Sequence, residues 1–324
     1  MMDWTDRHCR FFHRRLSRRC QLYTEMVTAP ALVRGGARHL LDHDPSEHPV
    51  VLQLGGSEPG ELAQAARMGW EAGYREINLN CGCPSDRVQS GAFGAVLMES
   101  PARVAEICAA MRAACPAEIT VKCRIGVDAQ VPEETLPVFL THLQAAGIGH
   151  VIIHARKAWL QGLSPKDNRT IPPLDYGLVL AMKTAFPRLR ISLNGGVTSL
   201  DQVQGLLDQG LDGVMVGRAA YQRPGDLLLG ADQQIFDARE APNLTQAMDE
   251  MRDYIAQETA RGTRLAAITR HMLGLFAGQP GARQWRRILS QEAHRPGAGV
   301  EVLDAALAAV ADAQDEICEQ VASG

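Results

Sequence analysis

The sequence predicts an α/β fold, a (β/α)8 TIM barrel followed by a C-terminal helical domain. Short β-rich runs alternate with segments that carry apolar residues at helical spacing, which is typical of a parallel sheet with right-handed crossovers. This alternation stops after about residue 225, and only helical patterns follow. We therefore expect a catalytic barrel domain over residues 1–230 and a helical domain over residues 231–324.

Seven runs have the composition of strands, one fewer than a complete barrel needs. They cover residues 21–28, 49–56, 76–82, 118–126, 150–156, 190–197 and 213–219. The missing strand should precede Thr5, because residues 6–17 have the pattern of the first helix. The chain would then lack most of its first strand, and such a barrel would expose two sheet edges.

Helical segments separate the strands and make up the tail. The clearest ones between strands are residues 60–74, 102–114 and 199–210, which stop at glycine or proline. In the tail the candidates are residues 245–262, 264–278, 282–293 and 300–323. Residues 157–177 form the longest irregular stretch, and a loop of that length in a compact domain is usually functional or disordered.

Composition favours a cytoplasmic protein without metal. The eight cysteines are scattered and form no C-x-x-C unit, so we expect free thiols in a reducing compartment and no zinc site. No stretch of 18 apolar residues occurs, and the N-terminus lacks the apolar region of a signal peptide, so no membrane association is expected. Nothing in the composition suggests an oligomer, and a monomer is the expectation.

Arginines are unevenly distributed in a chain whose net charge is −4. Only four of the 33 cationic residues are lysines, and residues 7–19 and 261–287 each hold six arginines and no acid. Two such windows in an acidic chain indicate a phosphate-rich partner. The alternative for either window is an ordinary solvated helix face.

Several predicted strands end in a polar side chain. In the run 76–82 the strand period puts Glu76, Asn78 and Asn80 on one face, and that face needs polar partners inside a barrel. Any one strand-end residue could be satisfied by a neighbouring strand alone. Because catalytic groups of these barrels lie at the carboxyl ends of the strands, the five together predict one site, formed by Gln53, Asn80, Lys122, His154 and Asn194.

Two glycine turns follow the last two predicted strands, where such barrels often bind phosphate. They are Asn194-Gly195-Gly196 and Gly217-Arg218. Glycine lets backbone N–H groups approach an anion and Arg218 adds a charge, although a tight turn also needs glycine for its geometry. An inward Lys122 must meet an electron-rich group, and a reduced flavin would suit it. No G-x-G-x-x-G follows any strand, so a tightly held dinucleotide is not expected.

The motifs N-x-N-x-G-C-P-S, T-V-K-x-R-I-G, I-I-H-A-R, N-G-G and V-M-V-G-R occur in this order. Their order and spacing resemble the tRNA-dihydrouridine synthases, FMN-dependent enzymes with a barrel and a helical tail. The loop after residue 154 and the stretch 269–287 resemble the A-type branch, which is associated with positions 20 and 20a of the D loop. The resemblance covers essentially the whole chain.

The resemblance implies roles for particular residues. Cys83 would be the proton donor, and Asn80 would contact tRNA. The positions that match flavin contacts are Met1, Met2, Gln53, Lys122, His154, Asn194, Gly195, Gly196, Gly217 and Arg218. The positions that match tRNA contacts besides Asn80 are Lys166, Arg169, Arg283 and Arg286.

The implied reaction reduces the C5–C6 bond of a uridine in tRNA. NADPH would reduce FMN and leave, a hydride would then pass to C6, and Cys83 would protonate C5. The uridine must first be extruded from the folded RNA, and the arginine windows and the long loop are the expected grips. Cys81, which the strand period would put on the same side as Cys83, is interpreted as a bystander.

Two other functions remain open at this level. One is an FMN-dependent dehydrogenase of a small pyrimidine, which would share the barrel, the lysine and the phosphate turns. The other is a flavin-free, truncated protein that binds tRNA without catalysis.

Overall fold

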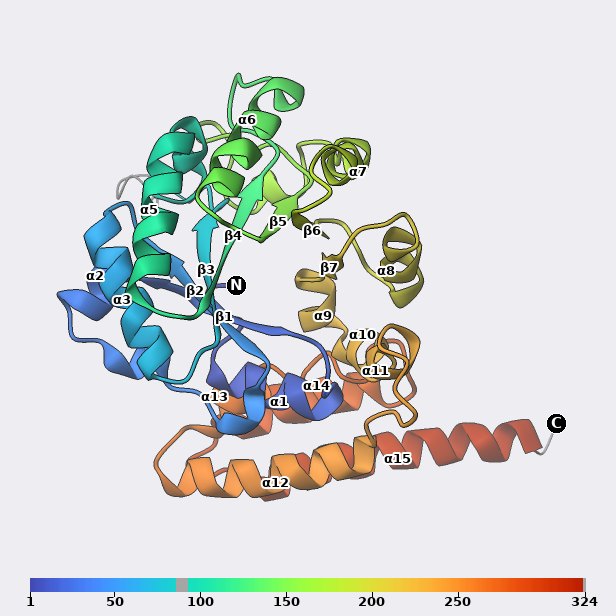
Figure 1. Ribbon diagram of the computed structural model, residues 1–324. Coiled ribbons are helices and arrows are strands. Elements are labelled where there is room, and N and C mark those ends of the chain that lie inside the picture. The colour runs from blue at the N-terminus through green and yellow to red at the C-terminus, as the bar shows by residue number, and fades with distance from the viewer. Residues whose placement is uncertain (86–92, 323–324) are drawn as a thin grey trace.

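The computed structural model describes residues 1–85 and 93–322 and contains one parallel, curled sheet (Figure 1). Its seven strands pair in chain order, and they correspond to the seven runs that the sequence predicts. The strands are β1 (Leu22–Thr28), β2 (Val50–Gly55), β3 (Glu76–Cys81), β4 (Glu118–Arg124), β5 (His150–His154), β6 (Arg190–Asn194) and β7 (Gly213–Met215). The prediction of a TIM-type α/β barrel with a helical tail is confirmed.

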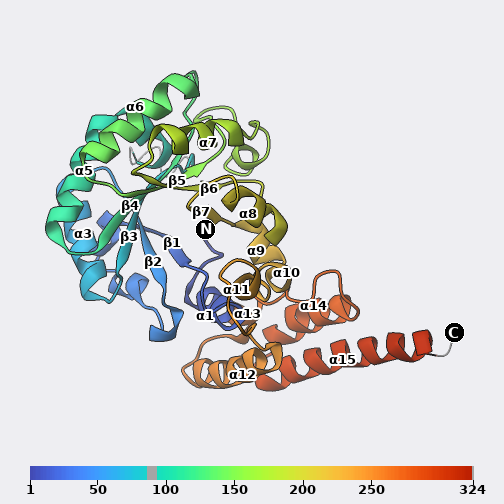
Figure 2. The ribbon, with the colours of Figure 1, turned by 45° about the vertical axis from the view of Figure 1, so that its right-hand side comes forward.

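Helices cover the outer face of the sheet and continue into the tail (Figures 1 and 2). Those of the barrel are α1 (Arg7–Leu16), α2 (Ala29–Val33), α3 (Pro59–Glu71), α5 (Pro101–Ala114), α6 (Pro132–Ala145), α7 (Tyr176–Ala185), α8 (Leu200–Leu207), α9 (Arg218–Gln222), α10 (Pro224–Leu228) and α11 (Ala231–Gln234). Those of the tail are α12 (Leu244–Ala260), α13 (Leu265–Thr269), α14 (Ala282–Gln291) and α15 (Val300–Ala322). Among the described residues, no helix has the length and apolar character to cross a membrane.

Short 3-10 turns complete the described secondary structure. They are η1 (Arg38–Leu41), η2 (Pro45–Glu47), η3 (Gly94–Glu99), η4 (Asp167–Arg169) and η5 (Glu292–His294). Several barrel helices start with proline, as α3 does at Pro59 and α5 at Pro101. Proline fits the first helical turn because its missing N–H would have no partner there.

The strand register brings the polar strand ends to the same level. Asn80 of β3 lies opposite Lys122 of β4, and His154 of β5 lies opposite Asn194 of β6. Gln53 lies opposite Asn78. The outward side chains of these strands pack into the main apolar core under the helices, so the polar side chains share the barrel interior.

In the described sheet, β1 and β7 are the first and last strands, and the N-terminal residues lie between them (Figure 1). The backbone N–H of Asp3 donates to Glu25 of β1. The ring of Trp4 stacks on that of Tyr221 in α9, with centroids 4.4 Å apart. Contacts with β1 and with α9, the helix that follows β7, therefore hold this segment in place.

A second apolar cluster joins the tail to the start of the chain. Phe12 and Leu16 of α1 pack with Met251, Trp285 and Leu303 of the tail helices. In the views of Figures 1 and 2, α12 and α15 lie below the barrel, and α15 extends past the other tail helices. The domain boundary near residue 230 stays a prediction, because the apolar face of α1 packs with residues on the far side of it.

A hydrogen-bonded network adds a polar link between α1, α9 and the tail. The carboxylate of Asp6 accepts hydrogen bonds from Arg270 and lies 3.1 Å from Nε2 of His271. Nδ1 of His271 lies 3.1 Å from the hydroxyl of Tyr221. Because Tyr221 also supports Trp4, this network connects the tail to the N-terminal segment.

Two of the six arginines in the window 7–19 are not available for the RNA surface that its composition suggests. Arg10 and Arg14 are each only 5% exposed. Arg10 pairs with buried Glu47, and Arg14 donates to backbone carbonyls, including that of Glu47. The expectation of a grip on RNA is therefore wrong for these two arginines, because buried groups of the protein itself occupy them.

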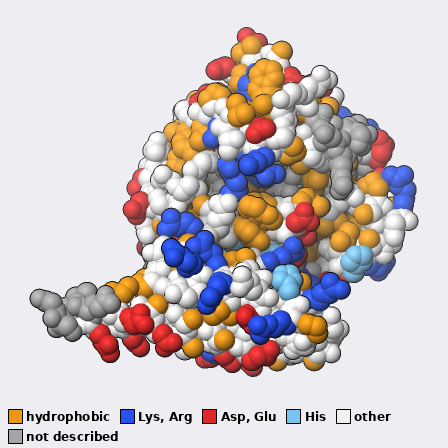
Figure 3. Space-filling view, turned by 180° about the vertical axis from the view of Figure 1, so that it is seen from behind, with side chains coloured by type: hydrophobic (Ala, Val, Ile, Leu, Met, Phe, Trp, Pro, Cys, Tyr) orange, Lys and Arg blue, Asp and Glu red, His pale blue; other side chains and the backbone are white. Residues whose placement is uncertain are grey.

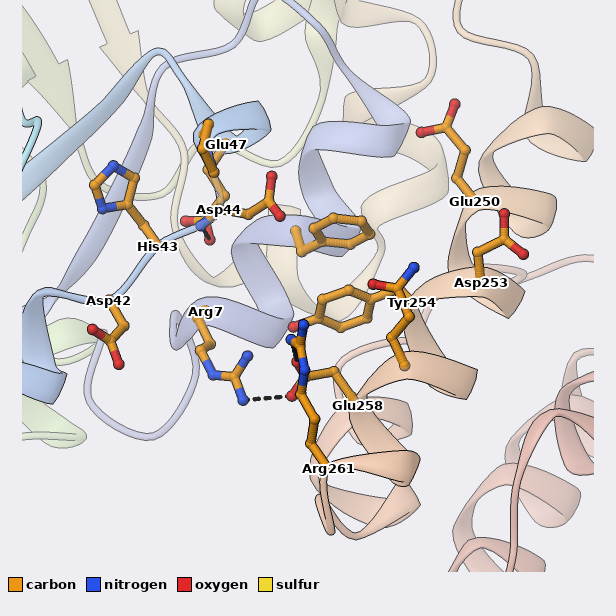
Figure 4. A pocket seen from close by; sticks show the side chains of 13 residues that line it. Arg7, Asp42, His43, Asp44, Glu47, Glu250, Asp253, Tyr254, Glu258 and Arg261 are labelled. Atoms are coloured by element: carbon orange, nitrogen blue, oxygen red, sulfur yellow. Dashed lines mark hydrogen bonds and ion pairs between the residues drawn. The ribbon is translucent and has the colours of Figure 1, made fainter.

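The outer side of this window borders an acidic cleft. Figure 4 shows Arg7 of α1 paired with Glu258 of α12, beside the carboxylates of Asp42, Asp44 and Asp253. The cleft has a volume of about 530 Å³. Its acidic lining would repel RNA phosphate.

The carboxylate of Glu258 is expected to contribute to the free energy of unfolding in a pH-dependent way. The hydrogen bond from Arg7 is the main reason that the pKa of this buried carboxyl falls from 4.5 to about 2. Glu258→Gln should lower the free energy of unfolding by about 3 kcal/mol at neutral pH. Because a lowered carboxyl pKa stabilises the fold above the unfolded value, this difference should shrink as the pH falls from about 4.5 towards 2. Urea unfolding of both proteins at several pH values measures it.

Glu106 supplies the matched control. It pairs with Arg103 on the exposed surface of α5, so Glu106→Gln should change the unfolding free energy by less than about 1 kcal/mol. A Glu258 variant no less stable than the Glu106 variant at neutral pH would contradict the assignment.

Candidate active site

A cavity of about 590 Å³ opens at the carboxyl ends of the strands. Its lining includes side chains from the ends of five strands, so the structure brings these predicted residues together. The predicted site residues that line it are Met1, Met2, Gln53, Asn80, Cys83, Lys122, His154, Arg169, Asn194, Gly195, Gly196, Gly217 and Arg218. The carboxyl ends of parallel strands meet at one rim, which explains why residues so distant in sequence converge.

Three predicted RNA contacts lie outside this cavity. Lys166 is exposed in the long loop, just before η4. Arg283 and Arg286 are exposed on α14, whose opposite face buries Trp285. Their positions suit contacts with a large ligand that extends beyond the cavity.

The cavity is electropositive. Among its described lining residues there is no Asp or Glu, whereas Lys122, Arg124, Arg169 and Arg218 all contribute. Burial, followed by the nearby Arg124, lowers the pKa of Lys122 to about 8. The ammonium group donates to Oδ1 of Asn194 at 3.0 Å, a neutral partner. The site therefore suits an anion that would neutralise these groups.

His154 lies among these cations as a neutral imidazole. Burial, and then the charges of Arg124 and Lys122, hold its pKa far below the ordinary value. A neutral ring offers one N–H donor and one acceptor nitrogen. His154 can therefore hydrogen-bond a polar ligand without adding charge.

Packing in the protein requires glycine at both positions after β6, whether or not an anion binds there. Gly195 has φ of +117°, and a Cβ there would lie 2.6 Å from the ring of His154. Gly196 has φ of +75°, and its Cβ would lie 2.5 Å from Leu174. Both residues therefore need to be glycine for geometric reasons. This geometry lets the backbone of the turn line the cavity closely.

Asn80 fixes the turn that carries Cys83. Its Oδ1 accepts the backbone N–H groups of Gly82 and Cys83, both at 3.0 Å. The Sγ of Cys83, which lines the cavity, lies 3.6 Å from Oγ of Ser85. The thiol is thus presented at the cavity by a rigid turn.

Cys81 lies on the other side of the sheet from the cavity. It is fully buried in the outer core, near Cys108 and Cys123, and burial raises the pKa of its thiol. The expectation that Cys81 and Cys83 project to the same side is wrong, because β3 ends at Cys81 and the chain then turns through Gly82. Cys81 takes no part in lining the cavity.

Arg124 is a site residue that the sequence reasoning missed. It is 2% exposed and donates to the carbonyls of Gly82, Lys157 and Asn168. It therefore ties the Cys83 turn to the long loop, and it also lines the cavity. The sequence could have predicted this residue, because Arg124 lies two residues after Lys122 in one strand and such residues share a face.

The long loop, residues 157–177, is a compact structure that Asn168 holds together. This residue is fully buried, and its side chain exchanges hydrogen bonds with the backbone N–H and carbonyl of Trp159. Trp159 itself is 42% exposed. The loop thus brings Arg169 to the cavity while it displays an aromatic ring and Lys166 to solvent.

The chain is similar to known proteins over nearly its whole length. A family model described as dihydrouridine synthase (Dus) matches residues 1–312. The tRNA-dihydrouridine(20/20a) synthase of Vibrio cholerae is 55% identical over 96% of this chain and 94% of its own. The protein of the same name from Escherichia coli strain K12 is 53% identical over 96% of this chain and 90% of its own.

A solved structure supports the fold alone. Morphinone reductase aligns with a TM-score of 0.50 over 76% of this chain and 85% of its own, at 12% sequence identity. Among the described residues, no group of three or more His, Cys, Asp or Glu side chains is arranged to hold a metal ion.

Burial of Lys122 is expected to lower the free energy of unfolding of the ligand-free protein. Its pKa falls from 10.5 to about 8 on folding, so the charged form is destabilised by burial. Lys122→Met should raise the unfolding free energy by about 2 kcal/mol at pH 7. Because the native state loses its proton first, the stability of the unmodified protein should rise from pH 8 to 10.5, and the difference should close. Denaturant titrations across this range measure it.

Lys183 gives the control for this pH series. It pairs with Asp212 near the surface, so Lys183→Met should lower stability slightly and should not reproduce the trend. A Lys122→Met protein that is less stable than the parent at every pH would refute the penalty.

Proposed function

The chain belongs to the dihydrouridine synthase family, and we propose that it reduces the C5–C6 double bond of uridines 20 and 20a in the D loop of tRNA. FMN is the bound cofactor in this proposal, and NADPH is the transient reductant. The observation that carries it is the single cavity in which Cys83, Lys122 and both glycine turns meet. The choice of positions 20 and 20a is supported by the names of the relatives.

The cavity fits a flavin mononucleotide in size and charge. Its volume of about 590 Å³ lies in the range of small-molecule sites. Gly195, Gly196, Gly217 and Arg218 would hold the phosphate, and Met1, Met2, Gln53, Lys122, His154 and Asn194 would line the ring. When bound and reduced, the flavin supplies a hydride for C6 of the uridine.

The protein supplies the proton. The turn fixed by Asn80 presents the thiol of Cys83, which would transfer its proton to C5 of the uridine and become a thiolate. Lys122 and Arg124 line the same cavity as this sulfur. The lost proton would be regained from solvent before the next turnover.

The RNA would bind at the rim of the cavity and on the surface beyond it. Lys and Arg side chains border the hollow on the face seen in Figure 3, whereas acidic side chains gather along the lower edge over the tail. Lys166, Arg169, Arg283 and Arg286 are exposed and available for phosphate, with Asn80 closer to the target base. In this proposal residues 1–230 bind FMN, residues 231–324 bind tRNA, and the enzyme acts as a cytoplasmic monomer.

Replacing Cys83 tests the proton donor. Cys83→Ala should abolish dihydrouridine formation, measured by mass spectrometry of digested tRNA, while NADPH still reduces the bound flavin at the normal rate. Cys81→Ala is the control, because that thiol lies in the core and not in the cavity, and it should keep the activity. Loss of flavin reduction in the Cys83 variant, or retention of product, would remove the assigned role.

The visible spectrum of the purified protein tests the cofactor. One FMN per chain, identified by mass after release, is the expected result. A colourless protein with normal tRNA affinity would favour the flavin-free RNA-binding alternative, and turnover of free uracil or dihydroorotate would favour the small-pyrimidine dehydrogenase.

Salt dependence tests the tail contacts. Each phosphate contact steepens the fall of log affinity with log salt by about 0.9 on B-form DNA and by about 0.7 on single strands. Removing two contacts with Arg283→Gln and Arg286→Gln should therefore lower that slope by about 2 and weaken tRNA binding. Arg103→Gln, which alters a paired arginine on the outer surface of α5, is the control. An unchanged slope in the double variant would exclude these arginines from the interface.

A further inference from the structure

A line of hydrogen bonds runs through the barrel interior beneath the cavity. It starts at Glu76, the first residue of β3, at the opposite end of the strand from the cavity. The hydroxyl of Thr120 donates to Oε1 of Glu76 at 2.9 Å. Nδ2 of Asn78 then donates to Oγ1 of Thr120 at 3.0 Å. Asn78 and Thr120 are fully buried, so water does not compete for these bonds.

The line continues to the turn that carries Cys83. Nε2 of Gln53 donates to Oδ1 of Asn78 at 3.0 Å. Nδ2 of Asn80 donates to Oε1 of Gln53 at 2.9 Å. Oδ1 of Asn80 accepts the backbone N–H groups of Gly82 and Cys83. Every link therefore runs in the same donor-to-acceptor direction.

The two ends of the line leave it only one direction. A side-chain amide can lie either way round at nearly the same shape, so the three amides alone do not define an orientation. Burial raises the pKa of the Glu76 carboxyl, while the hydrogen bonds from Thr120 and Gln21 favour its ionised form. An ionised carboxylate can only accept, and the backbone N–H of Cys83 can only donate. Turning any one amide would bring two donors or two acceptors together, which is costly in a buried site.

We propose that Glu76 and Thr120 are positioning residues that act through this line on Gln53 and on the turn of Cys83. The expected change in the rate of uridine reduction rests on the proposed function. The inference adds to that function two residues that do not line the cavity. Neither residue touches the cavity, and their effect passes through Asn78.

The line determines the orientation of Gln53 at the cavity. Gln53 is 8% exposed and lines the cavity. Its Oε1 accepts from Asn80 and its Nε2 donates to Asn78, which leaves one N–H and one oxygen lone pair for a ligand. The direction of the line places the oxygen of Gln53 beside Asn80 and its nitrogen beside Asn78. The two fixed ends of the line, the carboxylate of Glu76 and the backbone N–H groups of Gly82 and Cys83, thus decide which polar atom of Gln53 lies where.

Thr120 provides the sharpest test, because its hydroxyl can be removed at nearly constant shape. Thr120→Val should lower the single-turnover rate of uridine reduction by about 10- to 100-fold, with KM for tRNA unchanged. Thr120→Ser keeps the hydroxyl and should restore the rate to within about threefold of the parent. Gln21→Ala is the matched control, because it removes a different side-chain donor to Glu76 and leaves the bond from Thr120 in place.

Hydrogen exchange gives a readout that does not depend on activity. The amides of Gly82 and Cys83 should exchange slowly in the parent, the Ser variant and the Gln21 variant, and faster in Thr120→Val. If the parent itself forms no dihydrouridine, the proposed function fails, while the exchange data still test the line. Equal exchange and an equal rate in Thr120→Val and the parent would overturn the inference.

A second variant covers the case in which Thr120→Val does not fold. Glu76→Ala removes the oxygen that accepts the hydroxyl of Thr120, so this end of the line is no longer held in place. Slower uridine reduction, with faster exchange at Cys83, is the expected result. Parental values for both would overturn the assignment of Glu76.

Discussion

Polar side chains that point into a parallel barrel have no water to bind, and this constraint shapes the whole active site. In this protein the inward polar groups satisfy one another along the line from Glu76 to the turn of Cys83. The same bonds that pay for burial also orient Gln53 and Asn80 at the cavity. The same hydrogen bonds therefore stabilise the barrel interior and set the geometry of the site.

The cavity shows the opposite arrangement, in which groups are left uncompensated. Its described lining carries four cations and no carboxylate, and Lys122 has only a neutral hydrogen-bond partner. Such a site is strained electrostatically until an anion enters, so ligand affinity is gained at the expense of ligand-free stability. A flavin with its phosphate, and RNA at the rim, would relieve this imbalance in the proposed function.

Arginine serves two physical purposes in this chain, and composition does not separate them. Arg10 and Arg14 are buried against Glu47 and backbone carbonyls, whereas Arg283 and Arg286 project from α14 into solvent. Both windows looked alike as stretches of basic sequence without acid. The difference arises because Glu47 comes from a segment distant in sequence, which only folding brings to α1.

The sequence by itself determined the seven strands, the helical tail and the polar strand ends, because strand period and composition are local properties. Those signals also predicted the polar strand ends and the glycine turns that line the cavity. The tertiary structure decided the rest: the separation of Cys81 from Cys83, the tie made by Arg124, the support of Trp4 by Tyr221, and the direction of the line from Glu76. The first depends on where β3 ends and the chain turns. The others depend on which distant segments become neighbours, and a local pattern carries no information about that.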